Sequence, residues 1–352
     1  MPRTRAATLG RVNRRILTLL AALVPVLVLG IVGSAVTVPF VALGPGPTFN
    51  TLGVVEGKQV VDVQGAAVNP TSGNLNMTTV SVRDGLNIFE AFGLWADGNY
   101  GLVPRSEVYP PGVPRDQVDK SNQADFKNSE DNAELAALHY LKYPTEVQLD
   151  EVAADGPAKG LLEKSDQLIS VAGKPVATSQ DVVTSVQGAK PGVEVPIVVR
   201  RGGAEQTVVV KLGARPDDAS KGYLGVTPIE VAQGPIKVDF NLADIGGPSA
   251  GLMFSLGLVD KLSTGKLNGG KFIAGTGTID PEGKVGPIGG IQYKMIAAHD
   301  AGAQTFLVPA DNCNEARQRT PKGLHLIKVD TITTAITALN DLNTGKPTPT
   351  CG

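Results

Sequence analysis

The stretch Asp244-Ile245-Gly246-Gly247-Pro248-Ser249-Ala250-Gly251 joins two segments of different pattern. The run 236–242 before it predicts a strand, and the apolar run 252–262 after it predicts a helix. A serine at such a glycine-rich turn suits a nucleophile, because unpaired N–H groups at a helix start can stabilise an oxyanion. The alternative is that Ser249 only caps the helix. A residue that activates the hydroxyl would decide between the two.

The N-terminus predicts a membrane helix. Residues 1–15 carry five arginines and no acidic residue, and residues 16–38 are uncharged. About 20 apolar residues cross a bilayer, so we expect a retained anchor, with a cleaved signal peptide as the alternative. The arginines favour a cytoplasmic N-terminus, which places the remaining chain outside the cytoplasmic membrane.

Composition narrows the class of protein. The net charge of −2 gives no indication of a nucleic-acid partner. The histidines, His139, His299 and His325, are scattered, so the sequence predicts no metal site and no cofactor. Cys313 and Cys351 lie beyond the predicted anchor, where a disulfide and two free thiols are equally compatible with the sequence.

The segments after the anchor differ in pattern, and together they predict an α+β protein. Strands are expected at 60–63 and 75–82, and a helix at 128–141 with Ser129 as a candidate cap. Residues 97–118 are expected to be irregular. Further along the chain, a helix is expected at 291–301 and a strand at 305–309. The predicted organisation is a basic tail at 1–15, a membrane helix at 16–38, a link with strands at 39–144, a β-rich module at 145–213, an α/β segment at 222–342 and a tail at 343–352.

The module at 145–213 resembles a PDZ domain of the bacterial protease-associated type. The resemblance rests on GPAKGLL at 156–162, DQLISVAGKPV at 166–176 and KPGVEVPIVVRRGG at 190–203. It implies capture of an extended peptide at a sheet edge, with the peptide carboxylate held by backbone amides. The family's carboxylate loop precedes the first strand, where this chain has Tyr140 to Tyr143. Gly222-Tyr223-Leu224-Gly225 follows the last strand instead, so the binding segment stays open, as does a purely positional role.

Two residues are candidates for the base that would activate Ser249. His299 follows an apolar helical run, and a surface or structural position is the expected one for it. Lys294 is a single cation among apolar residues near a predicted helix start. Burial and the helix dipole both disfavour a protonated amine there, as a lysine base requires.

Two sequence blocks resemble the proteolytic domain of the Lon family of serine proteases. They are GGPSAGLMFSLGLVDKLS at 246–263 and AGTGTIDPEGKVGPIGGIQYKMIAAHDAGAQTFLVP at 274–309, within a region of about 226–340. With the anchor and the PDZ-like module, the chain resembles a membrane-anchored, PDZ-containing Lon-like protease of bacteria. The strands at 60–82 are then expected to complete the proteolytic fold, with the module inserted between its parts.

The Lon resemblance implies roles for individual residues. Ser249 is the expected nucleophile, Lys294 the general base, and Thr276 a residue that orients the lysine. The backbone N–H groups of Ser249 and Ala250 are the expected oxyanion donors. The chain departs from the family pattern at Gly247, where the family has Asp, and at Thr278, where it has Glu.

The expected activity is ATP-independent cleavage of unfolded or tail-exposed proteins. Residues 265–272 approach a phosphate-binding loop, but Phe272 stands where Ser or Thr is needed. The resemblance further implies protein or peptide substrates, the membrane as a partner and a homo-oligomer, commonly a hexamer. Two alternatives stay open: a non-catalytic PDZ adaptor with a Lon-like scaffold, and a Ser–His hydrolase.

Overall fold

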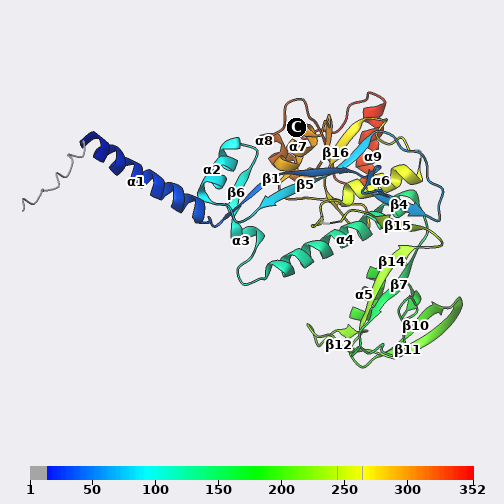
Figure 1. The fold of residues 1–352 in the computed structure, drawn as a ribbon. Coiled ribbons are helices and arrows are strands. Elements are labelled where there is room, and N and C mark those ends of the chain that lie inside the picture. The colour runs from blue at the N-terminus through cyan, green and yellow to red at the C-terminus, as the bar shows by residue number, and fades with distance from the viewer. Residues whose placement is uncertain (1–13, 244, 264) are drawn as a thin grey trace, which may run out of the picture. The chain divides into compact units, whose positions relative to one another are not determined.

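The computed structural model describes residues 14–243, 245–263 and 265–352 (Figure 1). Three arginines of the basic tail (Arg3, Arg5 and Arg11) lie outside the described residues, as does Asp244 of the turn that contains Ser249. The chain forms two compact units, Met1–Pro47 with Thr79–Val118 and Thr48–Thr78 with Asp119–Gly352. The helices and strands follow the predicted α+β pattern.

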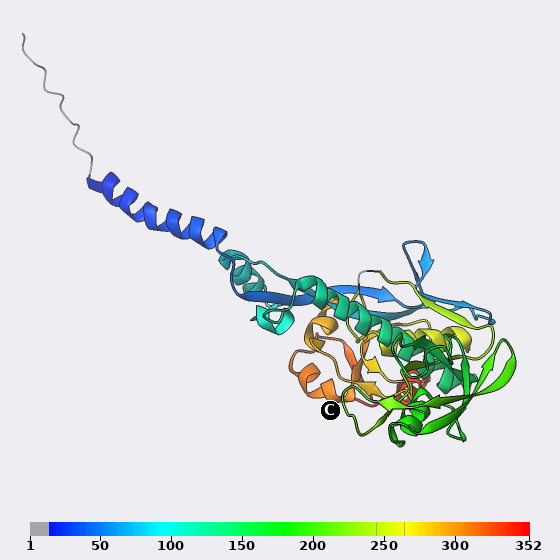
Figure 2. The same cartoon turned by 90° about the horizontal axis from the view of Figure 1, so that it is seen from below.

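The first unit begins with α1 (Arg14–Ala35), one continuous helix in Figure 2. Its segment Ile16–Ala35 has a mean hydropathy of 2.7 and is exposed along nearly its whole length, as in a membrane span or a signal sequence. The sequence predicted a short helix at 86–95, and α2 (Ile88–Asp97) confirms it. The predicted extended link and the predicted irregular stretch are more regular than expected, because they contain β1 (Phe40–Asn50), β6 (Gly101–Pro104) and α3 (Arg105–Val108).

The helix α4 (Arg115–Leu141) is 27 residues long and begins well before the helix predicted at 128–141. Its first half is polar and lacks an apolar stripe, so periodicity failed to indicate it. Ser129 therefore lies inside the helix and is not its cap. The second half supplies buried alanines to the core of the second unit, among them Ala133, Ala136 and Ala137.

The module forms a sheet in the order β11-β10-β8-β7-β14 (Figure 1). Its helix α5 (Ser179–Gln187) starts with a capping box between Thr178 and Asp181. Although the sequence assigned residues from 222 onward to the α/β segment, β14 pairs with β7 over its whole length. The strands are β7 (Thr145–Val152), β8 (Gln167–Val171), β9 (Lys174–Pro175), β10 (Glu194–Arg201), β11 (Ala204–Lys211), β12 (Gly213–Ala214), β13 (Gly222–Tyr223) and β14 (Val226–Ala232).

A second sheet combines strands from before and after the module. Residues 74–77 of β5 (Asn74–Arg83) pair in parallel with β16 (Phe272–Gly275), which pairs in turn with β19 (Thr305–Pro309), and β19 pairs with β20 (His325–Val329). A separate ladder joins β4 (Val61–Gln64) to β15 (Lys237–Phe240). The short elements of this region are β2 (Val54–Val55), β3 (Lys58–Gln59), β17 (Thr278–Ile279), β18 (Val285–Gly286) and the 3₁₀ turn Ala310–Asn312.

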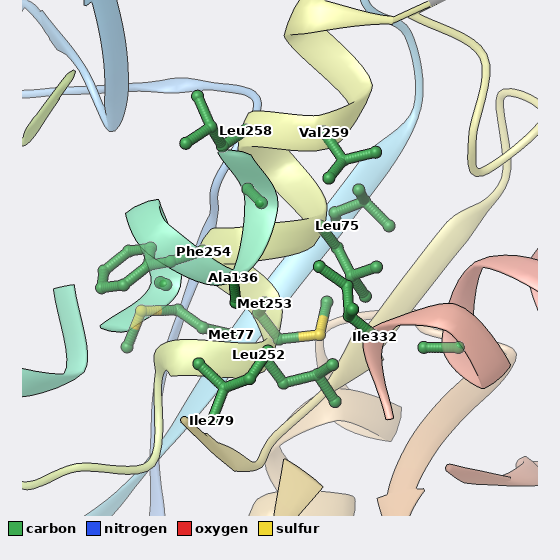
Figure 3. Packing of buried hydrophobic residues seen from close by; sticks show 14 of the residues in the cluster. Leu75, Met77, Ala136, Leu252, Met253, Phe254, Leu258, Val259, Ile279 and Ile332 are labelled. Carbon is green, nitrogen blue, oxygen red and sulfur yellow. The ribbon is translucent and has the colours of Figure 1, made fainter. Parts of the chain in front are cut away.

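The core of this region is built around α6 (Gly251–Leu262), every residue of which is buried. A helix that is apolar on all sides is stable only when it is covered all round. Figure 3 shows Leu252, Met253 and Phe254 of α6 among side chains of the sheet and neighbouring helices. The remaining helices are α7 (Ile291–Asp300), α8 (Cys313–Gln318) and α9 (Ile332–Asn343). A disulfide joins Cys313 to Cys351 and ties the C-terminal tail to α8.

Candidate active site

Ser249 and Lys294 lie side by side in the second unit. Ser249 is half-buried in the turn before α6, and Lys294 lies in the first turns of α7. The Nζ of Lys294 is 2.8 Å from the Oγ of Ser249 and donates a hydrogen bond of 2.7 Å to the carbonyl oxygen of Thr78. The first residue of α6 is Gly251, and its cap, Ala250, makes no side-chain hydrogen bond. The hydroxyl of Ser249 therefore faces an amine rather than capping the helix.

Burial controls the protonation of Lys294. Its side chain is 3% exposed, and loss of water lowers the pKa of the amine to about 7. A lysine in water has a pKa of about 10.4, so it would stay protonated at neutral pH. No carboxylate among the described residues bonds to the amine, so no negative charge there offsets the effect of burial. The amine is able to accept a proton near neutrality.

Thr276 holds the backbone of the serine and not the lysine. Its hydroxyl donates to the carbonyl oxygen of Ser249 at 3.1 Å, and the N–H of Gly277 donates to the same oxygen at 3.1 Å. Thr276 was predicted to orient Lys294, but among the described residues its side-chain hydrogen bond joins it to Ser249, and the second partner of Lys294 is the carbonyl oxygen of Thr78. The sequence offered no signal for Thr78, since a carbonyl oxygen is common to every residue.

The helix α4 supports the serine turn from the other side. The hydroxyl of Ser129 donates to the carbonyl oxygen of Pro248 at 3.0 Å, and the carbonyl oxygen of Asn122 accepts from the N–H of Gly247 at 2.8 Å. Gly247 has a φ of 87°, a conformation that side-chain-bearing residues rarely adopt. A glycine therefore suits this position next to Pro248.

The histidines have other partners. His299 is exposed and its ring lies 3.4 Å from Asp300. His139 lies between the carbonyl oxygen of Pro281 and the carboxylate of Glu230, whereas the third ring, that of His325, contacts Thr348. Among the described residues, none of these rings is hydrogen-bonded to Ser249, so the geometry gives no support to a Ser–His pair.

Backbone donors lie at the start of α6. Within the described part of the chain, the N–H groups of Ser249 and Ala250 donate to no backbone acceptor. They precede a helix of 12 residues, whose N-terminal end carries partial positive charge. The two groups can therefore stabilise negative charge next to Oγ.

The module contains a cavity of about 370 Å³ next to the loop Gly222–Gly225. Its walls are mainly apolar and come from α5 on one side and from β14 and the loop on the other. The loop lies directly before β14 (Val226–Ala232). The lining residues include Val182, Val183, Val186, Leu224, Val226 and Pro228, together with the charged side chains of Arg215 and Asp217.

Family models match both regions. The C-terminal proteolytic domain of Lon protease (S16) matches residues 241–340, and the PDZ domain matches residues 124–212. The chain contains a Lon-type proteolytic domain and a PDZ domain. The order of these domains after an apolar N-terminal helix agrees with the resemblance inferred from the sequence.

The chain is similar to several proteases over part of its length. It is 32% identical over 172 residues to Lon protease of Brevibacillus choshinensis, covering 44% of this chain and 20% of that protein. It is 32% identical over 115 residues to a probable periplasmic DegP-like serine endoprotease of Ectopseudomonas mendocina, covering 28% of this chain and 24% of that protein. A PDZ domain of an SdrC-like protein from Listeria monocytogenes is 25% identical with a TM-score of 0.22, covering 24% of this chain and 86% of that one.

The matched part is a fraction of the relatives. The chain spans between 9% and 24% of the length of the curated proteins it matches. These relatives are serine peptidases of the Lon and DegP-like kinds, and they support a serine peptidase as the class of this protein.

Proposed function

We propose that the chain is a serine endopeptidase in which Ser249 is the nucleophile and Lys294 the general base. The observation that carries the proposal is the 2.8 Å approach of Nζ to Oγ, with burial lowering the pKa of the amine to about 7. A neutral amine at that distance accepts the hydroxyl proton as Oγ bonds to a peptide carbonyl carbon. The N–H groups of Ser249 and Ala250 stabilise the resulting oxyanion.

The remaining steps use the same two side chains. The protonated Lys294 gives its proton to the departing amine, which leaves an acyl group on Oγ. Water then attacks the acyl carbon while Lys294 takes a proton from it, and return of that proton to Oγ restores Ser249. The carbonyl of Thr78 keeps the amine oriented throughout, because it binds one N–H in either protonation state.

Cleavage is proposed to need no ATP. The glycine-rich loop 265–270 is packed against α9, since the amine of Lys271 donates to the side-chain oxygen of Asn343 at 2.8 Å. A Cβ at Gly269 would overlap that same asparagine. A phosphate ligand is therefore not favoured here, because the lysine is already hydrogen-bonded to Asn343 and the asparagine fills the space beside the loop.

The PDZ domain is proposed to capture substrate chain ends in the cavity between α5 and β14. An extended peptide adds to the outer edge of β14, and its carboxylate meets the backbone of Gly222–Gly225. The chain is further proposed to be anchored by α1 with its catalytic part outside the cytoplasmic membrane, and to form a homo-oligomer. The arginines of residues 1–15 support this orientation.

The test is cleavage of an unfolded protein, such as casein, by the detergent-solubilised full chain without ATP. Ser249→Ala should abolish cleavage, whereas Ser255→Ala should not, since that buried hydroxyl donates to the carbonyl oxygen of Leu252 within α6. Activity that survives Ser249→Ala would refute the assignment. No cleavage by the wild-type chain, together with binding of peptides that carry a free carboxylate, would favour the PDZ adaptor.

A further inference from the structure

The helix α2 has two apolar faces, and only one of them is covered within the described part of the chain. Ala91 and Leu94 pack in a small core of the first unit that also contains Ala42 and Leu86. The adjoining face displays three large apolar side chains in one stripe, because their spacing of four and three residues follows the helix. They are Ile88, Phe92 and Trp95, which are 44%, 64% and 61% exposed.

The acidic residue at the start of α2 does not interrupt this stripe. The carboxylate of Glu90 accepts a hydrogen bond of 2.9 Å from the N–H of Asn87 and so closes the capping box. The rings of Phe92 and Trp95 contact each other, with centroids 5.9 Å apart. An exposed pair of aromatic rings on a short helix needs a partner that removes it from water.

The start of α2 is fastened to the end of α1. The N–H of Val38 donates to the carbonyl oxygen of Leu86 at 2.8 Å, and Thr37 forms a bridge with Asn87. The ring of Phe89 packs so closely on buried Gly33 that a Cβ there would lie 2.7 Å from it. The contact joins α2 to the last turn of the apolar segment of α1.

This attachment determines the depth of α2 in a membrane. The apolar segment of α1 has 20 residues, and a helix of that length is about 30 Å long, which matches the hydrocarbon thickness of a bilayer. The residues that follow Ala35 then reach the headgroup layer, where tryptophan and phenylalanine are favoured. Val36 and Phe40, in the segment directly after α1, add further exposed apolar surface.

We propose that the Ile88–Phe92–Trp95 face of α2 binds the lipid interface of the bilayer that α1 spans. The inference rests on the proposed membrane anchoring by α1. Two attachments, a spanning helix and an interfacial helix braced by Phe89 on Gly33, hold the first unit in a set orientation on the membrane. Neither attachment uses Ser249 or Lys294, so peptide cleavage in detergent tests the proposed function separately.

Trp95 provides the measurement because it is the single tryptophan of the chain. The full chain is reconstituted in phosphatidylcholine–phosphatidylglycerol vesicles, with and without lipids brominated on their acyl chains. We expect brominated lipid to quench most of the Trp95 emission and aqueous acrylamide to quench little of it. Phe92→Ser should weaken the lipid quenching, while Val209→Ser, a similarly exposed apolar residue of β11, should leave it unchanged.

Two results would overturn the inference. Efficient quenching by acrylamide without quenching by brominated lipid would place Trp95 in water. Protection from both quenchers would indicate that a second protein surface, such as another copy of the chain, covers the stripe. Resistance of the same vesicles to alkaline extraction reports insertion of α1, so loss of the anchor is distinguished from loss of the α2 contact.

Discussion

Two buried lysines of the Lon-type domain, Lys294 on α7 and Lys261 on α6, have similar burial and different chemistry. They are 3% and 5% exposed, and burial lowers the pKa of both amines. The Nζ of Lys261 donates to the side-chain oxygen of Gln59 at 2.9 Å and to the carbonyl oxygen of Val61. The negative charge of Asp62 offsets part of this lowering of the pKa of Lys261, whose net shift is still downward.

The two lysines differ in the groups to which their amines are hydrogen-bonded. Both partners of Lys261 are acceptors, so no proton is available for that amine to remove. Lys294 has one carbonyl acceptor and one hydroxyl, and the hydroxyl lies on a half-buried turn. Burial alone therefore does not make a lysine a base; a proton donor that a substrate can reach is also needed.

The largest expected effect is the difference in cleavage rate between variants that lack one lysine or the other. Lys294→Met is expected to lower kcat by on the order of 10⁴-fold or more, as losses of paired nucleophile and base do. It should also raise the free energy of unfolding at neutral pH by up to roughly 4 kcal/mol, because a neutral buried lysine is costly. Chemical denaturation and cleavage of an unfolded substrate measure the two effects.

Lys261→Met is the matched control for that comparison. It leaves the dyad intact, so cleavage should continue near the wild-type rate, while the carbonyl of Val61 loses its buried donor. A folded Lys261→Met protein without activity would contradict the distinction between the two amines, as would full activity in Lys294→Met.

The pH dependence should sharpen the same comparison. The pKa of Lys294 is about 7 in the folded chain, below its ordinary value of 10.5, so kcat should rise as pH increases through about 7. Between these two values the unfolded chain binds more protons than the folded one, so the unfolding free energy contributed by this group rises with pH. Lys261→Met should leave the pH midpoint of kcat unchanged. If Lys261→Met shifted that midpoint, the result would contradict the assignment of Lys294 as the base.

Thr276→Val should have an intermediate effect. It removes the hydroxyl bond to the carbonyl oxygen of Ser249 but leaves the bond from Gly277 in place. One hydrogen bond is worth about 1 to 1.5 kcal/mol, so a decrease in kcat of about tenfold is expected with KM nearly unchanged. A shifted pH midpoint would instead indicate that Thr276 acts on Lys294, as the sequence resemblance implied.

Ser129→Ala should give the smallest effect. The hydroxyl supports Pro248 from α4, and the bond between Asn122 and Gly247 remains to hold the turn. A decrease in kcat of about threefold is expected, with the pH midpoint unchanged. Unchanged kcat in a folded Ser129→Ala chain would show that α4 packs beside the turn without positioning it.

Much of the α/β region was predictable because its patterns are local. The predicted strand 305–309 is β19, and the predicted helices at 252–262 and 291–301 agree closely with α6 and α7. Each is marked by apolar periodicity or by glycine boundaries. The polar first half of α4 and the strands β1 and β6 have no such marks, so their regular structure was not indicated.

The extension of the PDZ sheet shows a different reason for a failed prediction. The strand β14 pairs with β7 in a register that sets Val226 opposite Val152 and Ala232 opposite Thr145. The two strands lie at opposite ends of the module's sequence, so no local pattern relates them. Pairing of this kind depends on which edge of the sheet the returning chain meets, and that edge exists only once the module has folded.

The sequence by itself determined the parts of this protein: an apolar N-terminal helix, a PDZ domain, a Lon-type domain, and Ser249 and Lys294 as the residues to bring together. Only the tertiary structure decided their chemistry. Hydrogen bonds that involve Thr78, Thr276 and Ser129 join positions far apart in the chain, and burial of Lys294 arises from the packing around α7. Spacing along a chain carries no information on such contacts, because they depend on which surfaces exclude water together.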